Sequence, residues 1–187
     1  MTLLRFETVA GARGGRLLFE DVSFALGPGD AALVSGPNGV GKSTLVRIAA
    51  GLLGAQSGRV TRNGQVALLT EAHALDPERS LGKALGLWIG DRANAALDVL
   101  GLGALADAPV RILSTGQRRR AALARVLASD AKIWLLDEPA NGLDSGAIEV
   151  LETLIAGHRA GGGIALTATH QPVKMIDATV VTLGMMR

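Results

Sequence analysis

The stretch Ala31–Thr44, AALVSGPNGVGKST, decides the fold class of this 187-residue chain. Its second part, Gly36 to Ser43, fits the pattern G-x-x-x-x-G-K-[ST], and a helical pattern runs from Lys42 to about Leu53. Glycines let such a loop wrap phosphate groups, with backbone N–H groups pointing inward at the positive end of the helix. The lysine then reaches the β- and γ-phosphates, and the next hydroxyl ligates Mg²⁺. The stretch therefore predicts a strand, a phosphate-binding loop and a helix.

Four further apolar runs have the length and composition of buried strands. They are VALLT (66–70), IWLLD (133–137), IALTAT (164–169) and TVVTL (179–183). Because polar residues do not alternate along them, we expect strands that are covered on both faces, as in a parallel sheet. Helical patterns at about 116–129 and 145–156 lie between these runs, which is typical of an α/β fold.

Two regions depart from this pattern. Residues 2–26 alternate apolar and polar side chains and predict an antiparallel β flap added to the sheet. Residues 72–112 contain two helical patterns, at 81–89 and 91–100, and together with the next helix they predict a helical insertion over approximately residues 72–131. We expect residues 1–187 to form a single domain of the P-loop NTPase type, with a mostly parallel sheet.

Composition excludes several classes of protein. The absence of cysteine excludes disulfides, thiolate metal sites and a cysteine nucleophile. A formal net charge of +2 and an aromatic content of 3% leave neither a basic stripe nor a stacking platform, so we expect no nucleic-acid partner. No apolar run reaches the roughly 20 residues that span a bilayer. Any membrane association is therefore expected to come through a partner only.

The segment Ile133–Glu138, IWLLDE, is the second motif with chemical content. An apolar strand that ends in Asp137 places a carboxylate beside the Mg²⁺ held by the phosphate-binding loop. Glu138 can then polarise a water molecule for attack on the γ-phosphate. Solvated acids at a strand end are the alternative, but the upstream loop favours the catalytic interpretation.

The third motif is LSTGQ, Leu113 to Gln117, which precedes an arginine-rich helix. Ser114, Gly116 and the helix N-terminus would make a second anion cradle, which cannot serve the same nucleotide as the first; an ordinary N-capped helix is the alternative. LSTGQ resembles LSGGQ, the signature sequence of ABC ATPases. This resemblance implies ATP and Mg²⁺ as cofactors, ATP hydrolysis, and a homodimer of nucleotide-binding domains in which the signature of one chain covers the ATP of the other.

The resemblance extends to most of the candidate site. Asn141–Asp144 matches the family's D-loop, and His170 ends a strand at the place of its switch histidine, so Lys42, Glu138 and His170 are the expected catalytic residues. The expected ATP-binding residues are Arg13, Gly36, Pro37, Asn38, Gly39, Val40, Gly41, Lys42, Ser43, Thr44, Ser114, Gly116 and Gln117, and the expected Mg²⁺ ligands are Ser43 and Asp137, with Glu71 as a third candidate.

Three positions depart from the family's pattern. Arg13 stands where an aromatic residue stacks on adenine, although a guanidinium plane can also stack on a base. Glu71 replaces a glutamine that senses Mg²⁺ and contacts the membrane subunit, which puts coupling in question. Thr115 replaces the middle glycine of the signature.

The stretch Gly161–Val173, GGGIALTATHQPV, resembles the ATP-binding subunits of cytochrome c biogenesis haem exporters. This implies integral membrane transporter subunits as partners, a place on the cytoplasmic face of the bacterial inner membrane, and ATP hydrolysis that powers haem export or release from a haem chaperone. An ATPase subunit of another ABC transporter remains open, because the membrane subunit chooses the substrate. A mechanical ABC module of DNA repair or translation would carry a coiled coil or a second cassette, and a P-loop kinase or GTPase would lack the signature.

Several other side chains carry structural expectations. Trp134 is expected to be buried, and His73 and His158 are expected at the surface. Four arginines of the signature helix are expected to form a solvated or interfacial face: Arg118, Arg119, Arg120 and Arg125. Four apolar residues of the insertion form either its own core or a docking surface for the membrane subunit: Leu81, Leu85, Leu87 and Trp88.

Overall fold

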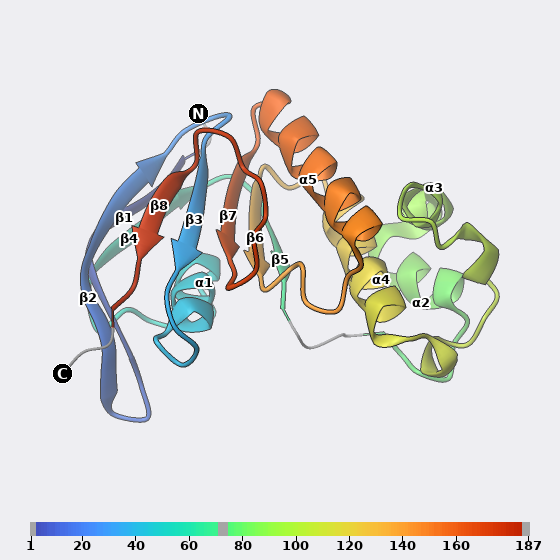
Figure 1. The fold of residues 1–187 in the computed structure, drawn as a ribbon, viewed down its shortest axis with the longest axis horizontal. Coiled ribbons are helices and arrows are strands. Elements are labelled where there is room, and N and C mark those ends of the chain that lie inside the picture. The colour runs from blue at the N-terminus through green and yellow to red at the C-terminus, as the bar shows by residue number, and fades with distance from the viewer. Residues whose placement is uncertain (1–2, 71–74, 185–187) are drawn as a thin grey trace.

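The computed structural model describes residues 3–70 and 75–184. A parallel sheet of five strands forms the centre, in the order β5-β6-β7-β3-β8 (Figure 1). Its strands are β3 (Ala31–Ser35), β5 (Val66–Leu69), β6 (Ile133–Asp137), β7 (Ile164–Ala168) and β8 (Thr179–Thr182). All five were expected from their apolar runs, and each predicted end lies within one residue of the observed end.

A second, antiparallel sheet has the order β2-β1-β4, with β1 (Leu3–Arg13), β2 (Arg16–Leu26) and β4 (Ser57–Asn63). The antiparallel pairing of the first two strands is confirmed. The prediction that this flap joins the main sheet is wrong, because in the described chain it forms a sheet of its own. Strand β4 was not expected, since Val60, opposite Phe6 of β1, is its only apolar side chain.

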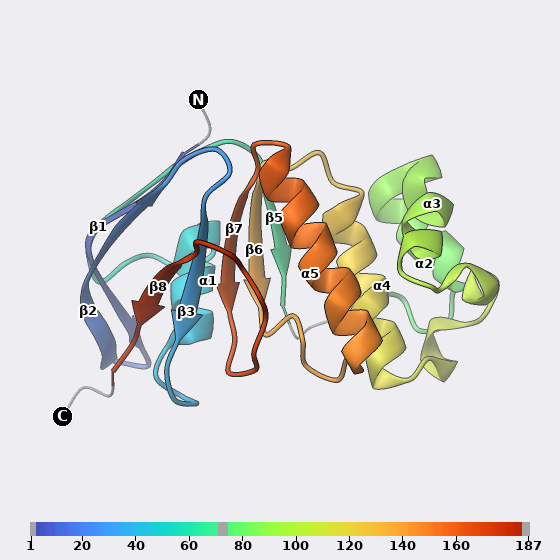
Figure 2. The same ribbon diagram turned by 45° about the horizontal axis from the view of Figure 1, so that its top comes forward.

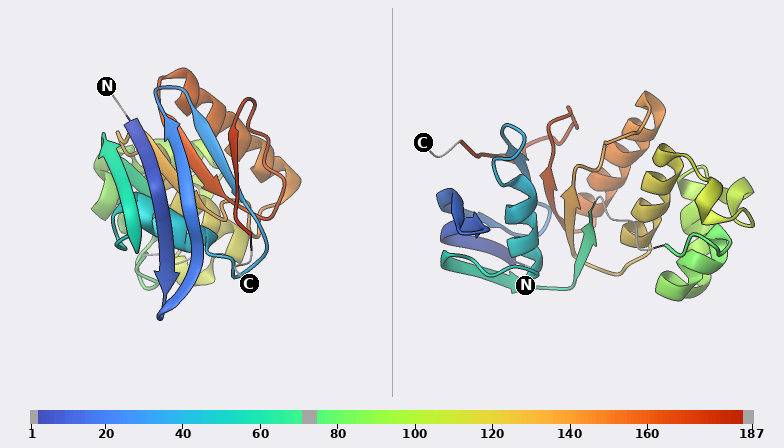
Figure 3. Two further views of the ribbon diagram at one scale, coloured as in Figure 1. Left: turned by 90° about the vertical axis from the view of Figure 1, so that its left-hand side faces the viewer. Right: turned by 90° about the horizontal axis from the view of Figure 1, so that it is seen from below.

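Helices fill the spaces between and beside the sheets (Figure 2; Figure 3, right). Helix α1 (Lys42–Ala50) lies between the antiparallel and the parallel sheet, whereas α4 (Thr115–Leu127) and α5 (Ser145–Ala160) lie on the other side of the parallel sheet. Helices α2 (Leu81–Ile89) and α3 (Ala93–Val99) lie beyond α4. No helix within residues 3–70 and 75–184 has the length and apolarity needed to cross a membrane.

The central strands are buried on both faces. Ile133 and Leu135 of β6 belong to one apolar cluster with α1 and the antiparallel sheet, whereas Trp134 and Leu136 belong to another with α4 and α5. All five residues of β6 are buried, as are all five of β7. Two apolar surroundings explain why these strands lack polar alternation.

The helical region between β5 and β6 contains the expected helices with small shifts. Helix α3 begins two residues later than predicted, because a 3₁₀ turn (Gly90–Arg92) precedes it, and two more 3₁₀ turns (Gly103–Leu105 and Val110–Ile112) lead to α4. Leu81 and Leu85 are fully buried and belong to the core, whereas Leu87 and Trp88 are 66% and 54% exposed. The guanidinium carbon of Arg125 lies 4.0 Å from the centroid of the Trp88 ring.

The expectation for Trp134 is confirmed, whereas His158, which was expected at the surface, is half-buried. The two rings stack with centroids 3.9 Å apart and planes 9° apart, and His158 Nε2 lies 3.2 Å from the Ile164 carbonyl oxygen. Burial in this stack lowers the pKa of His158 below its usual 6.5. His73 lies outside the described residues.

Candidate nucleotide site

Two glycines give the loop between β3 and α1 its shape. Gly36 has φ +142°, and a Cβ there would run into the carbonyl oxygen of Leu183. Gly41, with φ +111°, is the N-cap of α1, and it has no side chain to bond the first N–H groups of the helix. These unsatisfied N–H groups make a helix N-terminus that suits an anion.

Lys42 lies inside the loop with its side chain buried. Its Nζ donates to the carbonyl oxygens of Gly36 at 2.9 Å and Pro37 at 3.3 Å, and it lies 3.7 Å from Glu138 Oε1. A polyanion enclosed by the loop would therefore meet the ammonium group from within the cradle.

Ser43 and Asp137 form a pair of neighbouring oxygen ligands. Ser43 Oγ donates to Asp137 Oδ1 at 2.9 Å, and Asp137 is buried at the end of β6. Hydroxyl and carboxylate oxygens suit Mg²⁺, which normally keeps phosphate and water ligands as well. No group of three or more His, Asp or Glu side chains in the described chain could hold a metal ion by itself. The pair therefore fits a nucleotide-bound Mg²⁺ rather than a metal enclosed by protein. Glu71, the third candidate ligand, lies outside the described residues.

Glu138 is buried and lies between Lys42 and His170. It has a left-handed backbone with φ +49°, and its N–H donates to the carbonyl oxygen of Ala168 at 2.7 Å. Its Oε2 lies 2.8 Å from His170 Nδ1 and accepts from the His170 backbone N–H at 3.2 Å. The expected catalytic residues Lys42, Glu138 and His170 thus lie together, although they come from three separate segments of the chain.

These residues surround a cavity of about 460 Å³. Arg13, the residue expected near the base, also lines this cavity. Of the other lining residues, Leu18 was not expected from the sequence, and Asn141 was expected only as the first residue of the D-loop. The full lining is Arg13, Leu18, Asn38, Gly39, Gly41, Lys42, Ser43, Thr44, Glu138, Asn141 and His170. The other three loop residues, Gly36, Pro37 and Val40, are not among these lining residues, and Val40 is buried against the core.

The second expected cradle lies in a separate cavity of about 420 Å³. It is lined by Ser114, Gly116 and Gln117, together with Gly142 and Asp144 of the loop between β6 and α5. Ser114 Oγ accepts from the backbone N–H of Gln117 at 3.2 Å, and Gln117 Oε1 accepts from the N–H of Ser114 at 2.8 Å, so α4 begins with a capping box. A Cβ at Gly116 would collide with the Gly142 carbonyl oxygen. The two cavities share no lining residue, although the neighbouring residues Asn141 and Gly142 line one cavity each.

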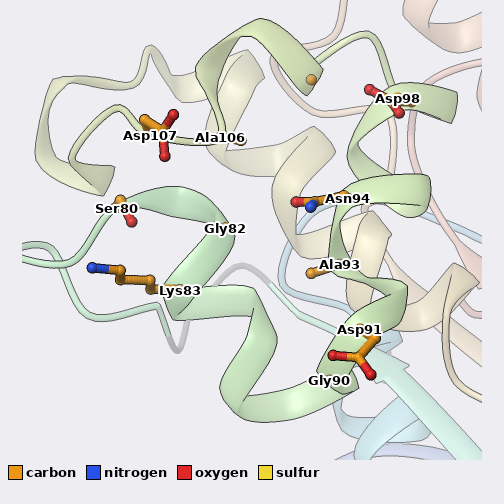
Figure 4. A pocket seen from close by; sticks show the side chains of 11 residues that line it. Ser80, Gly82, Lys83, Gly90, Asp91, Ala93, Asn94, Asp98, Ala106 and Asp107 are labelled. Carbon is orange, nitrogen blue, oxygen red and sulfur yellow. The ribbon is translucent and has the colours of Figure 1, made fainter.

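A third cavity, of about 570 Å³, lies beside α2 and α3 (Figure 4). Lys83, Asp91, Asp98 and Asp107 line it, but these side chains lie around its rim and do not converge on one point. It contains no glycine loop that opens a helix. Of these three cavities, the one around Lys42 combines a glycine loop, a helix N-terminus and a buried lysine, which are features that suit phosphate.

Arg119 differs most from the sequence prediction of a solvated or interfacial face. It is 3% exposed, and its Nη2 donates to the carbonyl oxygens of Asp137, at 2.9 Å, and Glu138. Its Nη1 donates to the Thr70 carbonyl oxygen at 2.8 Å. Arginine type alone gave no signal of this burial, which depends on α4 packing beside β5.

Comparisons with known proteins agree with this geometry. Residues 19–141 match the family model described as ABC transporter. The chain is 51% identical to the cytochrome c biogenesis ATP-binding export protein CcmA of Sphingopyxis alaskensis, over 98% of each chain, and 48% identical to the protein of the same name from Zymomonas mobilis, over 96% of this chain and 84% of that one.

Solved structures show the same fold. A chain from Pyrococcus furiosus, described as an ABC transporter ATP-binding protein, superposes with a TM-score of 0.85 at 21% identity over 97% of each chain. An ATP-binding subunit of an ABC transporter superposes with a TM-score of 0.79 at 25% identity, over 90% of this chain and 80% of that one. With the glycine loop, the strand-end acids and the LSTGQ helix in place, the chain belongs to the ABC transporter ATP-binding family, in which it is an ABC-type ATPase of the group of cytochrome c biogenesis ATP-binding export proteins.

Proposed function

We propose that this chain hydrolyses MgATP as the nucleotide-binding subunit of a transporter that exports haem, or releases it from a haem chaperone, during cytochrome c maturation. The observation that carries the catalytic part is the convergence of Lys42, Ser43, Asp137, Glu138 and His170 around the P-loop cavity. The relatives named for cytochrome c biogenesis support the biological part.

Each side chain has a distinct role in this mechanism. Lys42 and the α1 N-terminus bind the negative phosphates, and Ser43 and Asp137 would hold Mg²⁺, which neutralises charge on the β- and γ-phosphates when bound. Glu138 accepts a proton from the attacking water. His170 orients the Glu138 carboxylate through the 2.8 Å contact of its Nδ1, and it lines the cavity in which it would contact the γ-phosphate. The water oxygen bonds to the γ-phosphorus as the bond to the bridging oxygen of ADP breaks.

The separate second cradle supports a homodimer. Ser114 still has a hydroxyl hydrogen to donate, because its Oγ acts as an acceptor within the capping box. Two chains related by a two-fold axis would place Ser114, Gly116 and Gln117 of one chain over the ATP held by Lys42 of the other. ATP then bridges the interface with its phosphate charge, and hydrolysis weakens that bridge.

The dimer would work with integral membrane subunits at the cytoplasmic face of the bacterial inner membrane. We propose that residues 1–187 act as one domain and that the helical insertion, approximately residues 72–131, presents Leu87 to these subunits. Leu87 and its neighbour Trp88 are both exposed on α2, and adjacent exposed apolar side chains suit a contact with a partner. Arg13 would stack on the base of ATP.

The test is a complementation experiment, in which the chain is deleted from its host and then supplied again. Cells that lack the chain should contain apocytochromes c without covalently bound haem, as read by haem staining of membrane fractions. The unchanged chain should restore the stained bands, whereas Lys42→Ala should not. Normal haem attachment in cells that lack the chain would refute the role in cytochrome c maturation and point to another transported substrate.

The dimer is tested separately with purified protein. Glu138→Gln should dimerise on addition of MgATP and dissociate with ADP in sedimentation velocity. Adding Ser114→Arg should prevent this dimerisation while each chain still binds nucleotide. A double variant that still dimerises with ATP would refute the shared site.

A further inference from the structure

The guanidinium of Arg119 joins one helix to the ends of two strands. Arg119 lies in the second turn of α4, and it donates to the carbonyl oxygens of Thr70, directly after β5, and of Asp137 and Glu138, at the end of β6. No other arginine in the described chain contacts the Asp137–Glu138 backbone by a hydrogen bond. The contact therefore reaches the main chain of the two acids on which hydrolysis depends.

A buried guanidinium needs hydrogen-bond acceptors for its N–H groups. A buried charge is costly unless its donors are satisfied, and a planar guanidinium can serve several carbonyl oxygens at once. Hydrogen bonds from charged donors are also stronger than neutral ones. Arg118, at the preceding position, is only partly buried, and its Nη2 donates to the Arg111 carbonyl oxygen rather than to a strand end.

Glu138 needs such restraint because its backbone is left-handed. A non-glycine residue with φ +49° keeps that conformation only when its surroundings hold it. The Ala168 carbonyl oxygen holds the Glu138 N–H, and Arg119 holds the Glu138 carbonyl oxygen. Both peptide groups of Glu138 are thus fixed, and with them the direction in which its carboxylate leaves the backbone.

We propose that Arg119 is a positioning residue for ATP hydrolysis. It is not among the residues that line the nucleotide cavity, but it fixes the main chain from which the Glu138 carboxylate reaches the attacking water. This proposal rests on the proposed function, in which Glu138 is the general base. It predicts that Arg119 affects the hydrolysis rate through Glu138 and leaves MgATP binding unchanged.

The experiment is a double-mutant cycle on the full chain. Arg119→Lys keeps the positive charge, but one ammonium cannot reach carbonyl oxygens at two strand ends. In the otherwise unchanged chain it should lower the single-turnover hydrolysis rate by about tenfold or more, with the MgATP dissociation constant within about twofold. In the Glu138→Gln background it should lower the residual rate no further, because the two residues act through the same carboxylate.

Arg118→Lys is the matched control, since it makes the same substitution on the same helix turn without a contact to the strand ends. It should leave the hydrolysis rate within about twofold of the unchanged chain. If Arg119→Lys does not fold, Arg119→Gln, with two amide N–H donors and no charge, is measured by the same criteria.

Two results would overturn the role of Arg119. One is an unchanged rate for the folded Arg119 variant, and the other is the same fold-reduction in both backgrounds, which would mean that Arg119 acts independently of Glu138. A Glu138→Gln chain that keeps the full rate would instead overturn the proposed function, so the two failures are distinguishable.

Discussion

Glu138→Gln should separate ATP binding from ATP hydrolysis, because the structure gives the carboxylate contacts of two kinds. The amide keeps the size of the side chain and can still hydrogen-bond His170, which lies 2.8 Å from Oε2. It removes the negative charge 3.7 Å from Lys42 Nζ and the ability to accept a proton from water. Loss of a general base slows hydrolysis by about 10²–10⁴-fold, or about 3–5 kcal/mol of activation free energy.

Nucleotide affinity should change in the opposite direction. Lys42 also donates to the carbonyl oxygens of Gly36 and Pro37, so it stays in the loop when Glu138 becomes neutral. The phosphates then lose a nearby negative charge that repels them. We expect the dissociation constant of MgATP to stay constant or to fall by up to about tenfold, which is about 1.4 kcal/mol.

Single-turnover hydrolysis with enzyme in excess measures the rate, and titration with a fluorescent ATP analogue measures the affinity. Glu149→Gln makes the same chemical change on the exposed side of α5 and should keep both values within about twofold. A Glu138→Gln rate within about threefold of the unchanged chain would refute the assignment of the base. A loss of affinity that accounts for the whole loss of rate would show that the carboxylate holds nucleotide rather than water.

Three further predictions concern the metal, the pH dependence of stability and the partner. Asp137→Asn removes the charged oxygen beside Ser43 Oγ and should raise the Mg²⁺ concentration for half-maximal ATPase activity by about tenfold or more, as measured by Mg²⁺ titration at fixed ATP. Because burial lowers the pKa of His158 below 6.5, the unfolded chain binds this proton at higher pH than the folded chain, so the stability contribution is full above pH 6.5 and is lost as the pH falls. His158→Phe keeps the stack on Trp134 and should therefore reduce the drop in Tm between about pH 7.5 and about pH 5.5; an equal drop would contradict this. Leu87→Asp should abolish co-purification with membrane subunits, whereas Ile176→Asp, at another exposed apolar position, should not; each variant should still bind ATP.

The parts of the fold that the sequence predicts well are those buried on two faces. Residues 31–35 and 133–137 became strands with the expected ends, because both faces need apolar side chains and the flanking glycines or acids mark the ends. Strand β4 could not be found this way, since it is mostly exposed and its pairing with β1 comes from main-chain hydrogen bonds that any residue can make.

The same contrast, between what local sequence patterns predict and what depends on remote segments, holds for the candidate site. The motifs predict Lys42, Ser43, Asp137 and Glu138, because each has a fixed spacing from a glycine loop or a strand end. Arg119 was expected on a solvated or interfacial face and His158 at the surface, but Arg119 is buried against the ends of β5 and β6 and His158 is half-buried against Trp134. Side-chain type alone does not report such long-range burial.

The left-handed backbone at Glu138 implies a stability–activity trade-off at one position. A non-glycine residue in this region costs roughly 1–3 kcal/mol, which glycine would largely avoid. Glu138→Gly should therefore abolish hydrolysis and at the same time relieve this strain. Selection for thermal stability alone would remove the glutamate from this chain, and only selection for ATP turnover retains it.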